Sequence, residues 1–324
     1  MLIDTVVVGA GWSGLTAARV MAAAGRKVVV VEKSRGAGGR SATRRLHGGH
    51  FDHGAQYFTA RSAVFGRQLQ QWRDAGLVQP WRPRLAVIGN KSAHHDPEET
   101  SRFVAVPGMN AVCHHMASNL DCRFEQRVTS LCFDREWQLE LDSGERLQAN
   151  RMLVTAPPAQ AAALLGESDP LHEMLAGIAF NPCIAGMLSF EKPFDPGFDA
   201  AFVNQPGALS WIARNSSKPG RKGNDWVLHA TAEWSRSNLE APADEQARQL
   251  ASAFGGLVGE PLPATSRCTA HRWRYSQAPA PLERGMITDE DRRLAIAGDW
   301  LAGSRIEGAW TSGRKAGEWL AATG

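Results

Sequence analysis

The feature that most constrains the fold of this chain is a glycine-rich turn near its start. Residues 5–14 read T-V-V-V-G-A-G-W-S-G, and a helical pattern of apolar residues follows from Leu15. In a βαβ unit, the first glycine allows a tight turn, the second lets the backbone approach a pyrophosphate, and the third lets helix and strand pack closely. These roles fall on Gly9, Gly11 and Gly14. The spacing therefore predicts a strand, a dinucleotide-binding turn and a helix.

The end of the next apolar run narrows the choice of ligand. Val28–Val31 is followed by Glu32, 18 residues after Gly14. A carboxylate there can accept hydrogen bonds from a ribose 2′-hydroxyl, and it repels a 2′-phosphate. We expect the pyrophosphate to meet the amides of Ala10, Gly11, Trp12 and Ser13. The turn alone does not distinguish FAD from NAD, and a glycine-rich turn without a ligand is the alternative.

Length and composition exclude several classes of protein. A chain of 324 residues suggests two domains, or one large domain with an excursion. A formal charge of +3 is too small to indicate a nucleic-acid partner, and no basic stripe with interleaved aromatic residues extends from Arg44-Arg45. No apolar run approaches the ~20 residues of a membrane helix, and the start of the chain leads directly into the first strand. We therefore expect a cytoplasmic protein with neither a membrane nor a nucleic-acid partner.

Cysteine and histidine spacing gives no metal site. The five cysteines form no C-x-x-C pair, which favours reduced thiols: Cys113, Cys122, Cys132, Cys183 and Cys268. The two histidine pairs, His94-His95 and His114-His115, are adjacent in sequence, and adjacent side chains point in different directions on a helix or a strand. We expect surface or loop histidines there and no bound metal.

Hydrophobic periodicity and turn signals place the other elements. Helices are predicted over residues 62–75, 109–119, 243–254 and 312–322. A short apolar run lies at residues 85–88, and strands are predicted over residues 137–142, 146–149, 151–155, 185–190, 208–213, 226–232 and 294–297. The result is an α/β protein in which a dinucleotide-binding fold opens at residue 1, returns later and closes at the C-terminus. We assign residues 1–75, 105–160 and 266–324 to a discontinuous cofactor-binding domain. Residues 76–104 and 161–265 are assigned to a second, mainly β-sheet substrate domain.

A second group of motifs follows the acidic residue. Gly38-Gly39-Arg40 comes shortly after Glu32, and residues 51–59 read F-D-H-G-A-Q-Y-F-T. Residues 155–158, at the end of a predicted strand, read T-A-P-P. In this order, these segments resemble the flavin amine oxidase superfamily, and the 51–59 segment resembles its branch of renalases and their bacterial relatives.

The C-terminal third extends the resemblance. Residues 271–275 read H-R-W-R-Y and resemble a stretch of renalase-like proteins. The superfamily's C-terminal flavin element is similar to two segments here, A-G-D-W at 297–300 and G-S-R-I-E-G-A-W-T-S-G at 303–313. The resemblance implies an interrupted Rossmann-type FAD-binding domain, in the two-domain architecture of amine oxidases and p-hydroxybenzoate hydroxylase. It also implies non-covalent FAD, because no cysteine follows Cys268.

The resemblance implies a role for each matched residue. Glu32, with Lys33 beside it, holds the adenosine ribose, and Arg40 reaches the pyrophosphate. Gln56 and Tyr57 lie beside the isoalloxazine ring. The full set of implied cofactor residues is Gly9, Ala10, Gly11, Trp12, Ser13, Gly14, Glu32, Lys33, Gly38, Gly39, Arg40, Gln56, Tyr57, Val128, Gly298, Asp299 and Ile306. Within this set, the backbone of Val128 holds adenine, and Asp299 accepts a hydrogen bond from the ribityl chain. The amides around Ile306 meet the pyrimidine end of the flavin ring, where the N-terminus of a helix stabilises negative charge.

The expected reaction follows from the same resemblance. Amine oxidases often use an aromatic pair and a lysine near flavin N5, but this chain has only two tyrosines, and Trp310 stands where a tyrosine is often found. The resemblance to renalases implies a simpler reaction, in which the substrates are 2- or 6-dihydro isomers of NAD(P)H. The substrate donates a hydride to the flavin, and the reduced flavin then passes its electrons to O₂, which gives H₂O₂. No catalytic acid or base is needed, and none is assigned.

The expected substrate contacts rest only on their positions relative to the flavin motifs. They are Gln56, Tyr57, Ala185, Trp234, His271, Tyr275 and Trp310, and the tryptophans could equally be core residues. Arg44 and Arg45 could be solvated or could meet a phosphate-bearing substrate. A flavin amine oxidase, or another small-molecule flavin oxidase or dehydrogenase, is the alternative enzyme. A non-catalytic flavin-dependent sensor or binding protein is the alternative outside enzymes.

Overall fold

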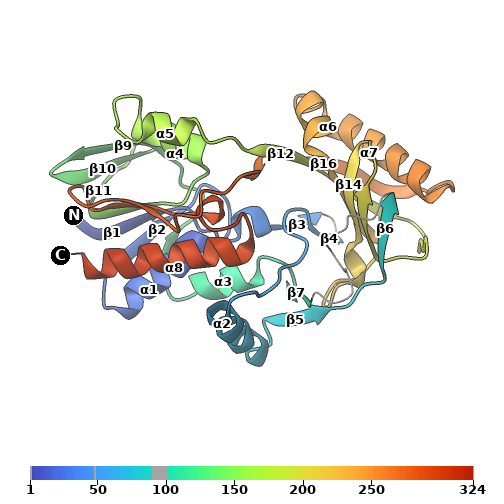
Figure 1. Cartoon of the computed structure of the whole chain (residues 1–324), viewed down its shortest axis with the longest axis horizontal. Coiled ribbons are helices and arrows are strands. Elements are labelled where there is room, and N and C mark those ends of the chain that lie inside the picture. Colours follow the sequence, from blue (N-terminus) through green and yellow to red (C-terminus); the bar gives the residue numbers. More distant parts are fainter. Residues whose placement is uncertain (1, 47–48, 90–100, 324) are drawn as a thin grey trace. The chain divides into compact units, whose positions relative to one another are not determined.

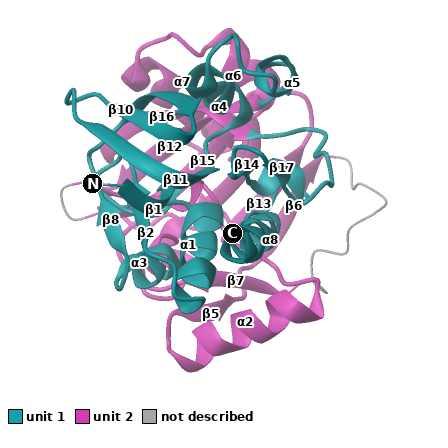
Figure 2. Cartoon of the chain, turned by 90° about the vertical axis from the view of Figure 1, so that its left-hand side faces the viewer, with its two compact units in different colours: residues 1–39, 112–180, 277–324 teal, residues 40–111, 181–276 magenta. Residues whose placement is uncertain are grey.

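The chain divides into two compact units in a computed structural model that describes residues 2–46, 49–89 and 101–323. Unit 1 comprises residues 1–39, 112–180 and 277–324, and unit 2 comprises residues 40–111 and 181–276 (Figures 1 and 2). Both units are therefore discontinuous in sequence. These compact units are a different division from the functional domains inferred above, which stay a prediction.

Unit 1 is built on an eight-stranded sheet. Its strands are β1 (Leu2–Val8), β2 (Val28–Val31), β8 (Asp121–Arg123), β9 (Val128–Asp134), β10 (Glu136–Leu141), β11 (Arg146–Val154), β17 (Ile287–Asp289) and β18 (Leu294–Ile296). The main path runs β17-β18-β11-β1-β2-β8, with β10 and β9 branching from β11. The central pairs β2–β1, β1–β11 and β11–β18 are parallel, and their strands are continuous apolar runs because both faces of a parallel sheet are covered.

Five helices accompany this sheet: α1 (Trp12–Ala23), α3 (Ala111–Ala117), α4 (Pro158–Leu165), α5 (His172–Ala176) and α8 (Ile306–Ala322), with a 3₁₀ turn at Asp299–Leu301. Helix α8 lies along α1 (Figure 1). A Cβ on Gly313 would stand 2.1 Å from the Ser13 carbonyl oxygen, and one on Gly317 would stand 2.8 Å from Ala17 Cα. The two helices therefore approach closely only because α8 carries glycines on the contact face.

Unit 2 contains a six-stranded sheet in the order β16-β12-β15-β14-β13-β6. Its strands are β6 (Leu85–Gly89), β12 (Asn181–Phe190), β13 (Ala200–Asn204), β14 (Leu209–Arg214), β15 (Asp225–Ala230) and β16 (Thr265–Gln277). Two small sheets pair β3 (Thr43–Leu46) with β4 (Gly49–Asp52) and β5 (Val78–Trp81) with β7 (Arg102–Ala105). The helices are α2 (Ala63–Asp74), α6 (Ala232–Ser237) and α7 (Ala243–Val258), with 3₁₀ turns at Gly39–Ser41 and Asn215–Ser217.

The core of unit 2 lies under α7, where Leu250 and Phe254 pack with Trp226 and the apolar residues of β12 and β15. The glycine at 186 accommodates α7, since a Cβ there would stand 3.3 Å from Leu250 Cδ1. The mainly β-sheet character expected for the second part of the chain therefore holds for unit 2, and the α/β class is confirmed for the chain.

Several predicted element bounds were wrong. The strands predicted at 146–149 and 151–155 form one strand, β11, which pairs with β10 in its first half and with β1 along most of its length. Helix α8 begins at Ile306, six residues before the predicted start at Ser312. Strand β15 ends at Ala230, because the Thr231 side chain accepts a hydrogen bond from the Trp234 amide and starts α6. Across the described ranges, no helix combines the length and apolarity needed to cross a membrane.

Candidate functional site

The glycine-rich turn of unit 1 has the geometry of a dinucleotide-binding turn. Gly9 has a φ of +109°, which favours glycine, and its amide donates to the Val31 carbonyl at 2.8 Å. A Cβ on Gly14 would stand 2.0 Å from the Gly9 carbonyl oxygen, so only glycine lets α1 begin here. Helix α1 starts at Trp12 with Gly11 at its N-cap, and its first amides and its dipole point toward the turn.

Glu32 is held firmly beside this turn. Its Oε2 accepts the Ala10 amide and its Oε1 accepts the Ser34 amide, both at 2.8 Å, and the side chain is buried. Each carboxylate oxygen has a further lone pair that a ribose hydroxyl can use. The Glu32 carbonyl accepts the Gln126 amide at 3.0 Å, which brings the start of β9, at Val128, to the same region. Lys33 is exposed and donates to Gln160 Oε1 at 3.2 Å.

The second glycine pair packs on the first. Gly38 and Gly39 have φ values of +137° and +52°, and the Gly38 amide donates to the Ala10 carbonyl at 2.9 Å. A Cβ on Gly39 would stand 3.4 Å from Gly11 Cα. Two motifs separated by some 25 residues of sequence therefore form one backbone surface around the start of α1.

The C-terminal motif of unit 1 contains the N-terminus of a second helix, α8, beside that of α1. The amide of Gly298 donates to Ser312 Oγ at 2.9 Å, and Asp299 follows as a buried residue of the 3₁₀ turn. Helix α8 begins at Ile306 and, through Gly313, contacts Ser13 in the first turn of α1. The structure thus brings into one unit the expected cofactor residues Gly9, Ala10, Gly11, Trp12, Ser13, Gly14, Glu32, Lys33, Gly38, Gly39, Val128, Gly298, Asp299 and Ile306.

Two observations test whether these residues fit a dinucleotide. The Ser13 hydroxyl is buried and has no hydrogen-bond partner among the described residues, although buried polar groups are normally paired. A Cβ on Gly11, at the same helix start, would meet nothing within 4 Å. The turn therefore offers an unpaired donor, helix amides and open space at one point, and these fit an anionic pyrophosphate.

The other three expected cofactor residues, Arg40, Gln56 and Tyr57, belong to unit 2. Arg40 Nη1 donates to the Ser276 carbonyl at 3.1 Å, and the Arg40 carbonyl accepts the Ala55 amide at 2.9 Å. A Cβ on Gly54 would stand 1.9 Å from the Arg40 carbonyl oxygen, so glycine is required where the two segments cross. The Arg40 segment and the 53–57 segment are therefore fixed to each other within unit 2.

A buried charge cluster supports the 53–57 segment, and nothing in the sequence pattern indicated it. The Asp52, Lys218 and Arg221 side chains are all 0% exposed. Arg221 donates to Asp52 Oδ2 through Nη2 at 2.7 Å and Nε at 3.0 Å, while Thr43 Oγ1 and the Met109 amide donate to Oδ1 at 2.7 and 3.0 Å. Burial alone would raise the pKa of Asp52, but Lys218 and Arg221 hold it below its usual value. The carboxylate is therefore ionised.

Tyr57 lies in an aromatic cluster of unit 2. Its ring is 6.1 Å from Trp81 and 5.6 Å from Trp211, centroid to centroid. Two cations face the cluster: the Arg102 guanidinium is 5.4 Å from the Tyr57 centroid, and the Lys218 ammonium is 5.5 Å from the Trp81 centroid. We did not predict Trp81 and Trp211 from the sequence, because isolated tryptophans carry no spacing signal that separates a site from a core.

Three histidines gather behind the 53–57 segment. His53 stacks edge-on to His271 at 4.6 Å, and His229 Nε2 lies 3.2 Å from the His53 carbonyl. Burial lowers the pKa of His53 to about 3 and those of His229 and His271 to about 4. All three imidazoles are therefore neutral at pH 7 and weak proton acceptors.

The remaining substrate candidates are scattered. Ala185 is buried on β12 and pairs with His229, whereas Trp234 lies on α6 against the core of unit 2. Trp310 is buried on α8 of unit 1 beneath Arg314. On β16 the partly buried residues His271, Trp273 and Tyr275 alternate with exposed Arg272 and Arg274, as successive residues of a strand do. Both arginines form ion pairs with Glu240. Arg44 and Arg45 are exposed on strand β3.

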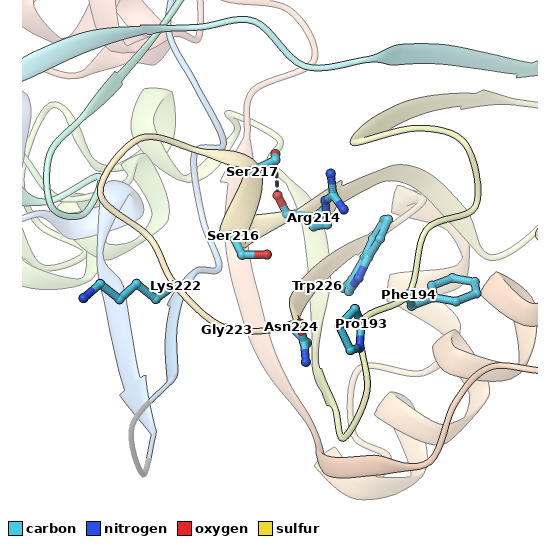
Figure 3. Close-up of a pocket in the computed structure, with 9 residues that line it drawn as sticks. All are labelled: Pro193, Phe194, Arg214, Ser216, Ser217, Lys222, Gly223, Asn224 and Trp226. Atoms are coloured by element: carbon cyan, nitrogen blue, oxygen red, sulfur yellow. Dashed lines mark hydrogen bonds between the residues drawn. The ribbon is translucent and has the colours of Figure 1, made fainter.

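A cavity of about 250 Å³ lies elsewhere in unit 2. It is lined by Pro193, Phe194, Arg214, Ser216, Ser217, Lys222, Gly223, Asn224 and Trp226. Figure 3 shows that the Lys222 side chain points away from Trp226, and Arg214 is ion-paired with Asp199. No residue that we predicted as a contact lines this cavity. In the part of the chain that the structure describes, no group of three or more histidine, cysteine or acidic residues could hold a metal; His94-His95 lies outside the described residues.

Comparison with known proteins agrees with this geometry. Residues 7–72 match the model of the NAD(P)-binding Rossmann-like domain, and residues 69–318 match that of the flavin containing amine oxidoreductases. A Mycobacterium tuberculosis protein named as a flavin-containing monoamine oxidase, AofH, is 35% identical over 107 residues. That match covers 27% of this chain and 23% of the relative, so it spans only about a quarter of the relative's length.

Solved structures share the whole fold. A protein described as a protoporphyrinogen oxidase from Exiguobacterium sp. 255-15 superposes with a TM-score of 0.78 at 13% identity, covering 99% of both chains. Cyclohexylamine oxidase from Brevibacterium oxydans IH-35A gives 0.77 at 14% identity, again over 99% of both. The fold therefore combines a Rossmann-like domain with an amine oxidoreductase domain. Because the second family model covers most of the chain, the chain belongs to the flavin-containing amine oxidoreductases.

Proposed function

We propose that this protein is an FAD-dependent oxidase of misreduced nicotinamide dinucleotides. The 2- or 6-dihydro isomer of NAD(P)H gives up a hydride, and with O₂ and a proton the products are NAD(P)⁺ and H₂O₂. Family membership supports a flavin cofactor. FAD is favoured over FMN because the Gly9–Gly14 turn suits a pyrophosphate and Glu32 suits an adenosine ribose.

The chain's contribution is binding and orientation. When bound, FAD supplies the hydride acceptor and passes the electrons on to O₂. The starts of α1 and α8 both present amides and positive dipole ends, which stabilise negative charge on a bound dinucleotide. For unit 2 we propose the substrate contacts, centred on the half-buried Tyr57, whose ring packs near the buried Trp81 and Trp211. Flat aromatic side chains suit a nicotinamide ring, whose placement decides which ring carbon donates.

One observation carries the choice of substrate: the region around the 53–57 segment is electropositive. Residues 40–61 contain four arginines and a single acidic residue, Asp52. Asp52 is already paired with both Lys218 and Arg221, so this buried cluster keeps one excess positive charge. A dinucleotide carries negative phosphates and is attracted to such a region, whereas a protonated amine is repelled.

The ionisable groups also suit a substrate that needs no base. Loss of hydride restores aromaticity to a dihydronicotinamide ring, so the reaction requires no proton removal from the donor. His53, His229 and His271 are weak proton acceptors because burial lowers their pKa values to about 3 or 4. Asp52 receives hydrogen bonds on both oxygens and does not act as a free base.

A flavin amine oxidase is the second candidate. Its support is the family itself and the similarity to the mycobacterial protein named as a monoamine oxidase. An amine substrate would need to be bound as the neutral form, since the cations near Tyr57 disfavour an ammonium group.

Anaerobic mixing separates the two candidates. The purified yellow protein is mixed in turn with 2- and 6-dihydro NAD isomers, ordinary NADH, and a panel of primary and secondary amines. We expect rapid bleaching of the oxidised flavin band by the isomers alone, followed by reoxidation and one H₂O₂ per donor when air is admitted. Bleaching by an amine while the isomers stay inert would reject the proposal.

A pair of charge variants tests the electrostatic support. The double variant Arg44→Ser/Arg45→Ser removes two exposed charges of the electropositive segment, and Arg67→Ser removes one exposed charge on α2. We expect a several-fold higher KM for the dinucleotide isomers, with a weaker salt dependence, only in the first variant. Equal effects in both would show that residues 40–61 do not attract the substrate.

A further inference from the structure

Lys218 is a lysine of unit 2 whose ammonium group is buried within the protein. The side chain is 0% exposed, and Nζ lies 3.0 Å from Gln56 Oε1, 3.1 Å from Asn215 Oδ1 and 3.4 Å from Asp52 Oδ2. An ammonium group has three N–H donors, and three acceptors surround it. The site therefore fits the charged form of lysine, although burying a charge is costly.

The contact with Gln56 fixes the orientation of that side-chain amide. Lys218 donates to Oε1, while Nε2 donates to the Asp52 carbonyl and, at 3.0 Å, to the Gly54 carbonyl. If the amide were flipped, Oε1 would face these two carbonyl oxygens and Nε2 would face the ammonium. The flipped state loses all three hydrogen bonds, so the Lys218 charge selects one orientation of Gln56.

Lys218 also contacts the aromatic cluster. Its Nζ lies 5.5 Å from the centroid of Trp81, the ring that neighbours Tyr57. Trp81 is tied to the same loop by a second contact, because its Nε1 donates to Ser217 Oγ at 3.2 Å. One lysine thus touches the residues on both sides of Tyr57: Gln56 along the chain and Trp81 across the cluster.

We propose that Lys218 is a positioning residue, whose buried ammonium group holds the Gln56 amide and the Trp81 ring so that Tyr57 is presented in a single arrangement. The contacts are internal to unit 2 and stand without a cofactor. Only the consequence for catalysis rests on the proposed function, in which Tyr57 contacts the substrate.

The charge of Lys218 can be switched by pH. Burial lowers its pKa to about 8, with Asp52 opposing and Arg221 adding to that change. His229 is also in electrostatic contact with Lys218, and it is neutral at pH 7 because burial lowers its pKa to about 4. When Lys218 loses its proton, a lone pair replaces one donor and faces an acceptor oxygen of Gln56, Asn215 or Asp52. The hydrogen bonding of the Gln56 side-chain amide should therefore change between about pH 7 and 9.

Nuclear magnetic resonance of glutamine side chains tests the proposal without substrate. The wild-type protein is labelled with ¹⁵N-glutamine, and the Gln56 amide signal is assigned by its loss in Gln56→Leu. We expect a solvent-protected signal that shifts with a midpoint near pH 8, and no such shift in Lys218→Met. A Gln56 signal that exchanges freely with water or does not shift in the wild-type protein would overturn the proposal, even if the variant failed to fold.

Arg221→Gln is the matched control. Arg221 shares Asp52 with Lys218, but its hydrogen bonds go to Asp52, Ala105 and Pro219 and none goes to Gln56. If Lys218 acts only as part of a structural charge cluster, both variants change the Gln56 signal alike. If Lys218 positions Gln56, the shift with pH persists in Arg221→Gln, with a changed midpoint, and disappears only in Lys218→Met.

Kinetics connect the positioning role to the reaction. With a donor that reduces the flavin, the reduction rate of the wild-type protein should change between pH 7 and 9, and that step should be absent in Lys218→Met. If the wild-type reduction rate does not depend on pH while the Gln56 signal does, the effect on catalysis is rejected. The role of Lys218 in holding Gln56 then still stands. Failure of every dihydronicotinamide donor instead rejects the proposed function, and the Gln56 signal still decides the role of Lys218.

Discussion

The two units use different parts of the polypeptide to build their candidate sites. In unit 1 the site is backbone: glycines at 9, 11, 14, 38 and 39 and the starts of α1 and α8. In unit 2 it is made of side chains from distant parts of the chain, since Gln56, Trp81 and Lys218 meet from three separate segments. A site made of backbone depends on the positions of glycines, which have no side chain. A site made of side chains depends on which residues the fold brings into contact.

This difference leads to different sensitivities. A dinucleotide turn fails when a side chain is added, because the added atoms occupy space that the backbone or the ligand needs. A buried charge cluster fails when a side chain is removed, because the remaining charges lose their partners. The predictions below use this contrast, beginning with the largest expected effect.

The Asp52→Asn substitution should cause the largest loss of stability. It leaves Lys218 and Arg221 as two buried cations without a carboxylate, and breaking a buried ion pair costs about 3–5 kcal/mol. Urea unfolding at pH 7 measures the change. Asp244→Asn, which removes an exposed carboxylate from the Arg248 pair in the first turn of α7, is the control and should lower the free energy of unfolding by no more than about 1 kcal/mol.

The pH dependence of this loss has a definite sign. Since the pKa of Asp52 is lowered in the folded protein, its contribution is complete above the unfolded value near 4 and disappears as the pH falls below it. The unfolding curves of wild type and Asp52→Asn should therefore converge in acid. Curves that stay a constant distance apart down to pH 3 would show that the carboxylate charge is not what stabilises unit 2.

Two alanine substitutions in the turn should separate folding from cofactor binding. Gly14→Ala places a Cβ 2.0 Å from the Gly9 carbonyl oxygen, and such overpacking costs about 1–3 kcal/mol. Gly11→Ala meets nothing within 4 Å, so it should preserve the melting temperature of the cofactor-free protein while lowering flavin affinity at least ~10-fold, about 1.4 kcal/mol. Fluorescence titration with flavin and thermal unfolding give both values. Equal flavin affinity in wild type and Gly11→Ala would contradict the backbone site.

The smallest expected effect concerns His229. Its pKa is lowered from 6.5 to about 4 by burial, so below pH 6.5 the unfolded chain binds a proton that the folded chain does not. Stability should fall as the pH drops from 6.5 to 5, by roughly 1–2 kcal/mol for this residue. His229→Gln should reduce that fall, measured by urea unfolding at the two pH values. An unchanged pH dependence in the variant would mean that His229 is protonated in the folded protein.

The contrast between the units also explains what the sequence could predict. The turn, Glu32 and the Gly38-Gly39 pair were readable because glycine spacing and an acidic residue after a strand have direct geometric meaning. Their assembly within unit 1 is confirmed by the Gly38–Ala10 and Glu32–Ala10 hydrogen bonds. Their ligand roles stay predictions.

The side-chain network around Gln56 and Lys218 could not be predicted from the sequence. Lys218 lies in a polar loop, S-S-K-P-G-R, whose composition is typical of a solvated turn, yet its side chain is fully buried. Trp81 lies on β5 in a two-stranded sheet and Trp211 on β14 in the six-stranded sheet, so only tertiary packing within unit 2 brings them near Tyr57. Gln56 was chosen from the resemblance, but its amide is already engaged by Lys218, Asp52 and Gly54. Long-range contacts of this kind leave no periodic signal.

The most direct test of the central claim is the flavin that acid releases from the purified wild-type protein. We predict one FAD per chain, identified by mass, with the polypeptide left colourless after precipitation because the cofactor is held by backbone amides and by Glu32 without a covalent bond. Recovery of FMN, of no flavin, or of flavin that stays with the precipitated polypeptide would contradict a dinucleotide site formed by the glycine turns of unit 1.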